Sequence, residues 1–420
     1  MRTAAAIVAV ILLAEPAGAQ AIGPVLERVR AERDPLIDTM RDLVSIESGS
    51  RDAGGLGAIA DVIAARLRAL GGAVELVEPS DVYRMDDTPE QIGKIVVGRF
   101  RGQGTRRILL LAHMDTVYQR GMLAAQPFRI DGDRAYGLGI ADDKHGVAII
   151  LHALAVLRAL NFSDYGLITV VINADEEVSS PGSRALLTRL GAEHDVVLSC
   201  EGAGDDDRLV LTTAGIGAVV LTVTGRASHA GAAPEQGRNA LYELAHQVLQ
   251  MRDLSEPATG RTLNWTVASA GTTRNVIPAT AQATADVRVR RTADFTGIEQ
   301  AVRERARTQL IAETTVSVAF ERRRPPLEMT PAARRLGAHA QSIYEELGKR
   351  LRVSDVSSGG GTDAAFAALE TQAPVIEGFG LQSFGAHSNE AEYVDLRSVE
   401  PRLYLLTRMV MDVATGATAP

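Results

Sequence analysis

Four groups of potential metal ligands stand next to apolar segments of the sequence. They are His113 with Asp115, Asp142 with Asp143, Asp175 with Glu176 and Glu177, and Glu201. Three of the groups come after an apolar run, and the Asp142 group precedes a stretch that is predicted to be helical. Because ligands gather beyond the carboxyl ends of the strands in an open α/β sheet, this placement indicates a metal or catalytic site.

His113 and Asp115 follow the apolar run 108–112. Histidine can bind a divalent metal through one ring nitrogen, while a nearby carboxylate accepts the other ring N–H and fixes the tautomer. Asp115 is close enough in sequence to play this second role. Taken alone, the pair is equally compatible with an ordinary turn at the end of a strand.

The segment 137–144, with the sequence GLGIADDK, combines glycines with adjacent acids before a predicted helix. The glycines permit a tight turn, and carboxylates suit the positive end of a helix. The segment is not a dinucleotide-binding fingerprint, because Asp142 stands where the third glycine belongs. Asp142 could bridge two cations, and an acidic helix cap is the alternative role.

Asp175, Glu176 and Glu177 form a run of three acids after the apolar segment 167–174. Three acids beside a buried strand are costly unless they are solvated, paired or bound to metal. One of them could bind a metal while its neighbour acts as a general base on a metal-bound water. An exposed acidic loop is the alternative.

His387, in the segment 384–390, completes the set of candidate ligands. Two histidines, one shared acid and two further acids would give each of two zinc ions a histidine, a carboxylate and a bridging carboxylate. The coordination positions that remain could hold water, as a catalytic zinc site requires.

Apolar strands alternate with helical stretches around these residues, which is typical of an α/β fold with a mostly parallel sheet. The predicted strands are Ile95–Phe100, Ile108–Ala112, Leu167–Ala174, Val196–Ser199 and Ala373–Glu377. The predicted helices are Val147–Leu160, Arg184–Leu190, Pro331–Leu347 and Val399–Val413.

The segment between Ala214 and Arg324 has a different pattern. We predict in turn strand Ala218–Val223, helix Asn239–Met251, strand Leu263–Ser269, strand Ala281–Arg290, helix Phe295–Thr308 and strand Thr315–Phe320. This β-α-β-β-α-β order is the ferredoxin-like unit. We therefore expect an inserted domain at 214–325, flanked by the two parts of a larger domain at 23–213 and 326–420.

Charge and the N-terminal segment restrict the class of protein. The net charge is −8, whereas a nucleic-acid binder would normally carry a basic stripe. The apolar run Ala4–Ala14 after Arg2 is too short to span a bilayer, and Ala17-Gly18-Ala19 has the pattern that signal peptidase cleaves. We expect a signal peptide at 1–19, export to the periplasm or medium, and no membrane-spanning segment.

Seven motifs of the sequence resemble those of the di-zinc aminoacylase/carboxypeptidase family. They are HMDTVY at 113–118, YGLGIADDK at 136–144, DEE at 175–177, ASHAGAAPE at 227–235, NVIPA at 275–279, GGGTDAA at 359–365 and AHSNEAEYVD at 386–395. Within this family the sequence is most similar to the bacterial folate-cleaving glutamate carboxypeptidases. The resemblance covers nearly everything after the expected signal peptide, and it implies a zinc-peptidase catalytic domain with an inserted ferredoxin-like lid and dimerisation domain.

The resemblance implies a role for each candidate ligand. Asp142 would bridge two zinc ions, and the peptide bond that follows it is expected to be cis. One zinc would also be bound by His113 and Glu201, and the other by Glu177 and His387. Glu176 would be the general base, and Asp115 would orient His113.

Substrate contacts are implied in the same way. His229 would polarise the scissile carbonyl from the partner subunit of a homodimer, although a lone histidine there could be a surface residue. Arg324 would bind the α-carboxylate of the substrate, with Arg288 as a second candidate, although the run Arg322 to Arg324 could be a solvated patch. Asn275 would be a further polar contact. The glycines around Gly360 lack the P-loop lysine and indicate close backbone approach to the substrate.

The expected activity is hydrolysis of an amide bond next to a free carboxylate, with release of glutamate from folate-like or N-acyl substrates. A dipeptidase or N-acyl-amino-acid deacylase of the same family is the nearest alternative. A zinc-binding protein without catalysis would have no need of Glu176. A serine hydrolase using Ser357 or Ser358 would lack the G-x-S-x-G motif.

Two residues depart from the family pattern beside the candidate ligands. His145 stands where a glycine usually follows Asp-Asp-Lys, and Cys200 precedes Glu201 where bulkier residues are common. Both changes leave the ligand set intact and bear on the shape of the substrate pocket.

Overall fold

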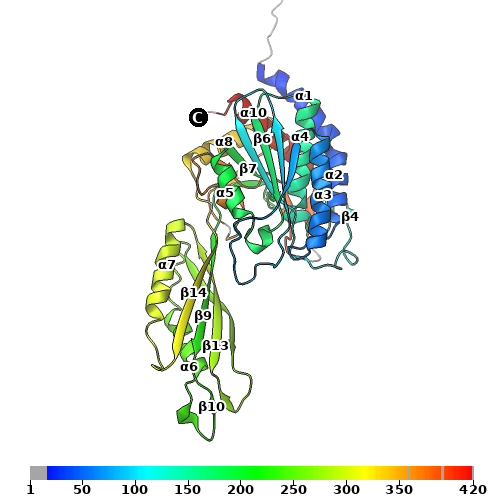
Figure 1. The fold of residues 1–420 in the computed structure, drawn as a ribbon. Coiled ribbons are helices and arrows are strands. Elements are labelled where there is room, and N and C mark those ends of the chain that lie inside the picture. Colours follow the sequence, from blue (N-terminus) through cyan, green and yellow to red (C-terminus); the bar gives the residue numbers. More distant parts are fainter. Residues whose placement is uncertain (1–16, 358, 389–391, 419–420) are drawn as a thin grey trace, which may run out of the picture.

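The computed structural model describes residues 17–357, 359–388 and 392–418, with the side chains from residue 23 onward. Most of the expected signal peptide at 1–19 lies outside the described residues. Figure 1 shows a larger domain of sheet and helices from which an elongated second domain projects. We call this second domain, residues 215–324, the lid. In the described part of the chain, no helix is both long and apolar enough to cross a membrane.

The larger domain is built on a six-stranded sheet. Its spatial order is β1 (Ala73–Val77), β2 (Ile95–Arg101), β6 (Leu167–Asn173), β3 (Arg107–His113), β7 (Val196–Ser199) and β16 (Val375–Ile376). The pairings from β6 to β16 are parallel, and those of β2 with β1 and β6 are antiparallel. Strands β6 and β7 are buried throughout, which explains their continuous apolar sequence. The predicted mixed, mostly parallel sheet is confirmed.

Helices cover both faces of this sheet. The alternate strand residues Ile108 and Leu110 belong to the main apolar cluster, and Leu109 and Leu111 belong to a separate cluster on the other face. The main cluster receives α1 (Ala17–Ala31), α2 (Arg33–Val44), α3 (Ala53–Ala69), α4 (His145–Ala159), α8 (Pro331–Glu345) and α10 (Val399–Thr415). The second cluster receives α5 (Arg184–Ala192) and the short α9 (Ala364–Ala367). The carboxyl ends of the parallel strands are thereby left to form a site.

The lid has the predicted β-α-β-β-α-β order. Its elements are β9 (Gly215–Thr224), α6 (Ala240–Gln250), β11 (Thr262–Ala270), β13 (Thr280–Val289), α7 (Thr292–Arg305) and β14 (Thr315–Arg324). The four strands form an antiparallel sheet in the order β11-β13-β9-β14. Apolar residues of α6 and α7 pack on one face of this sheet and form a core of their own.

Several short strands were not predicted from the sequence. They are β4 (Arg129–Asp131) and β5 (Arg134–Tyr136) with β17 (Ser383–Phe384) and β18 (Tyr393–Asp395), β8 (Arg208–Val210) with β15 (Arg352–Ser354), and β10 (Ser228–His229) with β12 (Val276–Ile277). Two or three residues are too few to show an alternating pattern. Strands β5 and β17 matter for the site because they lead into the segments that carry Asp142 and His387.

Candidate active site

His113 lies at the end of β3, next to the acids that follow the neighbouring strand β6. The two strands are parallel and in register, so that His113 pairs with Asn173. The Nε2 atom of His113 is 2.9 Å from Oδ1 of Asp142. Its Nδ1 atom is 3.1 Å from the carbonyl oxygen of Asp115 and 3.3 Å from the carboxylate of the same residue. One ring nitrogen is therefore held by Asp115, and the other faces the cluster of acids.

Asp115 connects the end of β3 to the turn that bears Glu176 and Glu177. Its carboxylate is fully buried and accepts hydrogen bonds from the backbone N–H groups of Glu176 and Glu177, each at 3.1 Å. The hydroxyl of Ser50 donates a third bond, at 2.8 Å. The residue predicted to orient His113 thus also fixes the backbone of the predicted base.

Asp142 lies between the two candidate histidine ligands. Its Oδ1 atom faces His113, and its Oδ2 atom is 3.2 Å from Nε2 of His387. The same nitrogen of His387 is 3.0 Å from Oε2 of Glu177. The Asp142–Asp143 peptide is cis, as the resemblance implies. One carboxylate therefore contacts both imidazoles, each through a different oxygen, which is the arrangement expected of a bridging ligand.

The electrostatics of this centre favour a cation. Hydrogen bonds to Asp142 and Glu177 raise the pKa of His387 to about 10. Burial alone would raise the pKa of Asp142, but the two imidazoles outweigh it and lower that pKa. In the described structure, Oε1 of Glu177 is buried without a hydrogen-bond partner. Imidazole and carboxylate groups are the nitrogen and oxygen ligands that zinc prefers, so the residues present fit a zinc centre.

Glu201 lines the same cavity as Asp142, Glu177 and His387. The ligand atoms of Asp142, Glu177 and His387 lie within 4.8 Å of one another, and Glu201 is not part of that set. Its Oε1 atom accepts a hydrogen bond from the hydroxyl of Thr362 at 3.2 Å. The cavity has a volume of about 600 Å³, and its lining includes Asp142, Glu177, Glu201 and His387. Its opposite wall comes from the lid, through residues 216–218 and 284–286.

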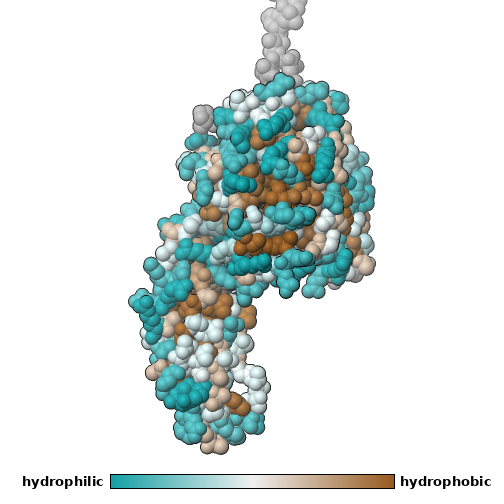
Figure 2. Space-filling model, in the orientation of Figure 1, coloured by the Kyte–Doolittle hydropathy of each residue, from teal (hydrophilic) through white to brown (hydrophobic). Residues whose placement is uncertain are grey.

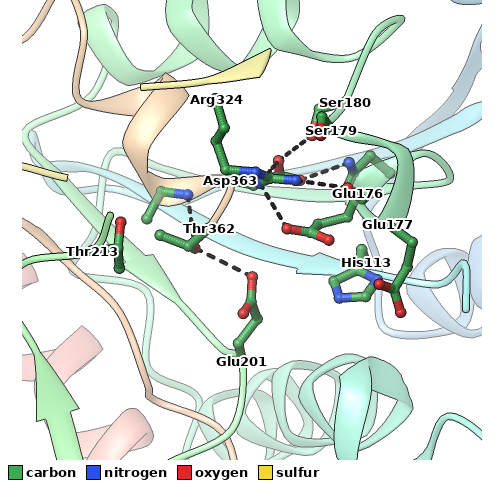
Figure 3. Close-up of polar contacts among 12 residues, drawn as sticks. His113, Glu176, Glu177, Ser179, Ser180, Glu201, Thr213, Arg324, Thr362 and Asp363 are labelled. Atoms are coloured by element: carbon green, nitrogen blue, oxygen red, sulfur yellow. Dashed lines mark hydrogen bonds and ion pairs between the residues drawn. The ribbon is translucent and has the colours of Figure 1, made fainter. Parts of the chain in front are cut away.

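Glu176 lines this cavity and is paired with a buried arginine from the lid (Figure 3). Nη1 of Arg324 is 2.7 Å from Oε1 of Glu176 and 3.0 Å from Oδ1 of Asp363, and Nη2 donates to the carbonyl of Glu176 at 2.6 Å. Burial raises the pKa of Glu176, and the charge of Arg324 opposes that rise. Arg324 is only 3% exposed. The arginine predicted to bind the substrate thus already contacts two protein carboxylates, those of Glu176 and Asp363.

Arg288 and the glycines at 359–361 form another part of the cavity wall. Arg288 pairs with Asp286 at 2.9 Å and donates to the carbonyl of Gly359 at 3.0 Å. Gly360 also lines the cavity, and its carbonyl accepts a bond from Ala214 at 2.8 Å. A Cβ atom on Gly361 would lie 2.5 Å from Cδ of Arg324. The backbone at Gly361 thus lies close to Arg324, and the approach of these glycines to a substrate stays a prediction.

His229 and Asn275 lie together in the lid, away from the cavity. Strands β10 and β12 pair His229 with Val276, and the carbonyl of Asn275 accepts a bond from Ala230 at 2.9 Å. The Nδ1 atom of His229 accepts two backbone N–H bonds, so its ring proton is on Nε2. Neither residue lines the cavity. Figure 1 shows β10 at the end of the lid that is farthest from the six-stranded sheet of the larger domain. A single chain does not bring these two residues to Glu176.

Two buried acids of the site were not singled out from the sequence. Asp363 accepts hydrogen bonds from Asn173 at 2.7 Å and from Ser180, in addition to Arg324. Glu392 accepts bonds from the backbone N–H groups of Gly139 at 3.1 Å and Ala141 at 2.8 Å, and so holds the turn that precedes Asp142. Both acids lie inside motifs of the family resemblance, and this position is the feature of the sequence that could have indicated a role for them. Their hydrogen-bond partners lie too far away in sequence to be identified.

The two departures from the family pattern are accommodated beneath the site. His145 begins α4, is fully buried, and its Nδ1 atom donates to the carbonyl of Ile140 at 2.9 Å. Burial lowers the pKa of His145 to about 4, so this residue is neutral. Cys200 is buried, and burial raises the pKa of its thiol. Neither residue displaces a candidate ligand.

Comparison with known proteins shows the family to which the chain belongs. The chain matches peptidase family M20/M25/M40 over residues 109–412. It is 43% identical to Carboxypeptidase G2 from Pseudomonas sp. (strain RS-16) over 418 residues, which cover 99% of this chain and 98% of that protein.

Two solved structures have the same fold. Aminopeptidase PepT from Bacillus cereus ATCC 10987 gives a TM-score of 0.73 at 22% identity, covering 91% of this chain and 99% of that one. The YXEP protein of Bacillus subtilis, described as a dinuclear metal-binding peptidase of the M20 family, gives 0.68 at 15% identity, covering 93% and 100%. The chain therefore belongs to the peptidase family M20/M25/M40.

Proposed function

We propose that this metallo-carboxypeptidase uses two zinc ions to hydrolyse the amide bond next to a free carboxylate, and that it releases C-terminal glutamate from folate-like or N-acyl substrates. The observation that carries the proposal is the position of Asp142 between His113 and His387, beside Glu176. The identity of 43% with Carboxypeptidase G2 over nearly the whole chain supports the specificity.

Five residues are proposed to hold the metal. Asp142 would be shared, with His113 and Glu201 on one zinc and Glu177 and His387 on the other. The contacts of Asp142 with both imidazoles and the unpartnered Oε1 of Glu177 support this set. When bound, the two ions would supply Lewis acidity, which makes water a nucleophile near neutral pH and polarises the substrate carbonyl.

Glu176 is proposed to move the proton. Its carboxylate lines the cavity and its backbone is fixed by Asp115 and Arg324, so its position is defined on both sides. In the reaction, Glu176 would accept a proton from the attacking water and pass it to the leaving nitrogen of the released amino acid.

Arg324, Arg288 and Gly360 are proposed to form the site for the substrate carboxylates. All three line the cavity. Arg324 donates to Glu176 and Asp363, so a substrate carboxylate would have to share this guanidinium with them. Arg288, at the cavity wall with its partner Asp286, offers a second cation for the same purpose.

A homodimer formed through the lid would bring His229 and Asn275 of the partner subunit to the cavity. The outer face of α6 supports this proposal, because Leu241, Tyr242 and Leu249 are 45%, 63% and 60% exposed. Val267 on the edge strand β11 is exposed as well. Figure 2 shows a visible lid face that is largely hydrophilic or neutral, with a few hydrophobic patches. His229 would then polarise the scissile carbonyl through Nε2–H.

We also propose that the chain is exported after cleavage near Ala19. The N-terminal pattern of Arg2, the apolar run Ala4–Ala14 and Ala17-Gly18-Ala19 supports this.

The substrate preference is tested with the purified mature protein and a panel of substrates. We expect release of glutamate from folate or methotrexate, loss of that activity with a chelator, and recovery with added zinc. Activity confined to dipeptides or N-acyl-amino acids would reject the glutamate specificity and assign the nearest alternative. Chelator-insensitive release would reject the metal chemistry.

A further inference from the structure

Arg184, the first residue of α5, binds three backbone carbonyl groups. Its Nη2 atom donates to the carbonyl of Ser179 at 2.5 Å and to that of Arg323 at 2.8 Å, and its Nε atom donates to that of Ser180 at 3.2 Å. Two of these carbonyls belong to the turn after Glu176 and Glu177, and the third belongs to the lid strand β14. One guanidinium therefore joins the two domains beside the proposed base.

Two aromatic rings hold this guanidinium in place. Its central carbon is 4.2 Å from the ring centroid of Tyr83 and 4.8 Å from that of Phe366. Lysine can also interact with aromatic faces, but it lacks the planar group with which arginine stacks on a ring and donates hydrogen bonds as a fork. The position therefore depends on the shape of the group as well as on its charge.

The turn that Arg184 binds has a backbone conformation that needs support. Ser179 and Ser180 have φ angles of 68° and 54°, in the left-handed region that residues with a side chain seldom adopt. Such a conformation persists only where the surroundings hold it. The turn is closed by bonds from Ser179 to the carbonyl of Glu176 at 2.8 Å and from Ser180 to that of Asp175 at 2.7 Å. Arg184 then binds the carbonyls of both left-handed residues.

The turn is held from the lid as well. Arg324 follows Arg323 in β14 and binds both the carbonyl and the carboxylate of Glu176. Arg184 lies on the other side, where it lines a crevice of about 530 Å³ that also includes Phe295 and Arg322 of the lid. Arg184 is not among the residues that line the catalytic cavity. Its effect on the reaction therefore passes through the groups that it binds, which are the turn and the lid strand β14.

We propose that Arg184 is a positioning residue that holds the turn 176–180, and with it Glu176 and Glu177, in a fixed place against the lid strand. The proposal rests on the proposed function, in which Glu176 moves the proton. Replacing Arg184 changes none of the proposed metal ligands, the base or the substrate-binding residues. It removes the hydrogen bonds that support the turn on which the base lies.

The test compares Arg184→Met with the wild type, both loaded with zinc. We expect kcat for glutamate release to fall at least tenfold, KM to change less than threefold, and zinc per chain to stay the same. We also expect amide hydrogen exchange in residues 175–183 to become at least tenfold faster. A kcat within twofold of the wild type, or unchanged exchange in this segment, would overturn the proposal.

Arg189→Met is the matched control, because Arg189 is an exposed arginine of the same helix that lines the same crevice. It should leave kcat and exchange unchanged, and an equal loss there would also overturn the proposal. Arg184→Lys keeps the charge and carries the test if the methionine variant does not fold. We expect its kcat to fall at least fivefold, and a value within twofold of the wild type would contradict us. The exchange measurement needs no substrate, so it tests Arg184 even if the wild type releases no glutamate.

Discussion

At the scale of single residues, the site depends on how one carboxylate is shared. Asp142 contacts His113 with one oxygen and His387 with the other, while Glu177, in the turn after β6, contacts the same nitrogen of His387. Glu176, the neighbour of Glu177, points into the same cavity and is bound by Arg324. Adjacent glutamates can therefore have different roles because their partners differ.

The role of Glu176 predicts the effect of removing its charge. We expect Glu176→Gln to lower kcat by about 10²- to 10⁴-fold, the usual contribution of a general acid–base group, while zinc per chain stays unchanged. Initial rates and metal analysis on the same sample would measure both quantities. Glu345→Gln, on the exposed face of α8, should have no effect on either. A Glu176→Gln rate above a few per cent of the wild type would contradict the assignment.

Residue types and motifs in the sequence are enough to predict that Asp142, Glu177 and His387 lie together. They are not enough to predict which residue pairs with Glu176. Arg324 lies 148 residues further along the chain, and its sequence context of three arginines suggests a solvated patch equally well. In the structure, Arg322 pairs with Glu299 inside the lid, whereas Arg323 pairs with Asp87 of the larger domain. Successive side chains of a strand point to opposite sides, and the pairing of β14 with β9 shifts register between Arg322 and Arg324, so the three arginines have different partners.

At the scale of elements, buried polar bonds connect the pieces that carry the site. Asp363, just before α9, accepts bonds from Asn173 of β6, from Ser180 of the turn and from Arg324 of β14. It is 4% exposed, so its charge has little contact with water. Breaking a buried pair from one side leaves an uncompensated charge, which is the costly case.

We therefore expect Asp363→Asn to lower the free energy of unfolding by about 3 kcal/mol, at the lower end of the range for breaking a buried ion pair, because Arg324 keeps Glu176 as a partner. Urea denaturation of the zinc-loaded proteins would measure it. Asp355→Asn is the control: its pair with Arg334, at 2.9 Å, is exposed on both sides and should be worth less than about 1 kcal/mol. Equal effects of the two changes would show that the buried network does not stabilise the fold.

Several long elements could be predicted because their patterns repeat, whereas the helices α1, α2 and α3 were not predicted from the sequence. The buried strands β3, β6 and β7, and the alternating strand β13, follow the periods that burial on two faces or one face imposes. The short strands β5, β17 and β18 have too few residues for any period, and only tertiary pairing defines them. Strands β5 and β17 lead to Asp142 and His387, so this part of the site needed the structure.

At the scale of the whole molecule, His229 lies away from the cavity, so the role proposed for it would need a second chain. The lid extends away from the catalytic sheet, and β10 lies at its far end (Figure 1). The exposed apolar residues of α6 give such a chain a surface to pack on. A symmetric dimer in which each lid serves the other subunit would complete both sites.

This arrangement predicts complementation between two inactive variants. His229→Ala and Glu176→Gln should each have little activity as pure dimers. When the two variants are co-expressed, half of the dimers should contain one chain of each kind. In such a hybrid one of the two sites has both Glu176 and the partner's His229. We therefore expect about one quarter of the wild-type activity. Isolating the doubly tagged hybrid and measuring its rate tests this. No recovery in the hybrid would mean that His229 does not act across the dimer.

The zinc content of Asp142→Asn tests the central claim most directly, because this claim places two ions on one shared carboxylate. Metal analysis of the purified, dialysed proteins, with circular dichroism to check that both are folded, would give zinc per chain. We expect two zinc ions per wild-type chain and fewer than one in Asp142→Asn. A folded Asp142→Asn protein that still holds two zinc ions would contradict the account.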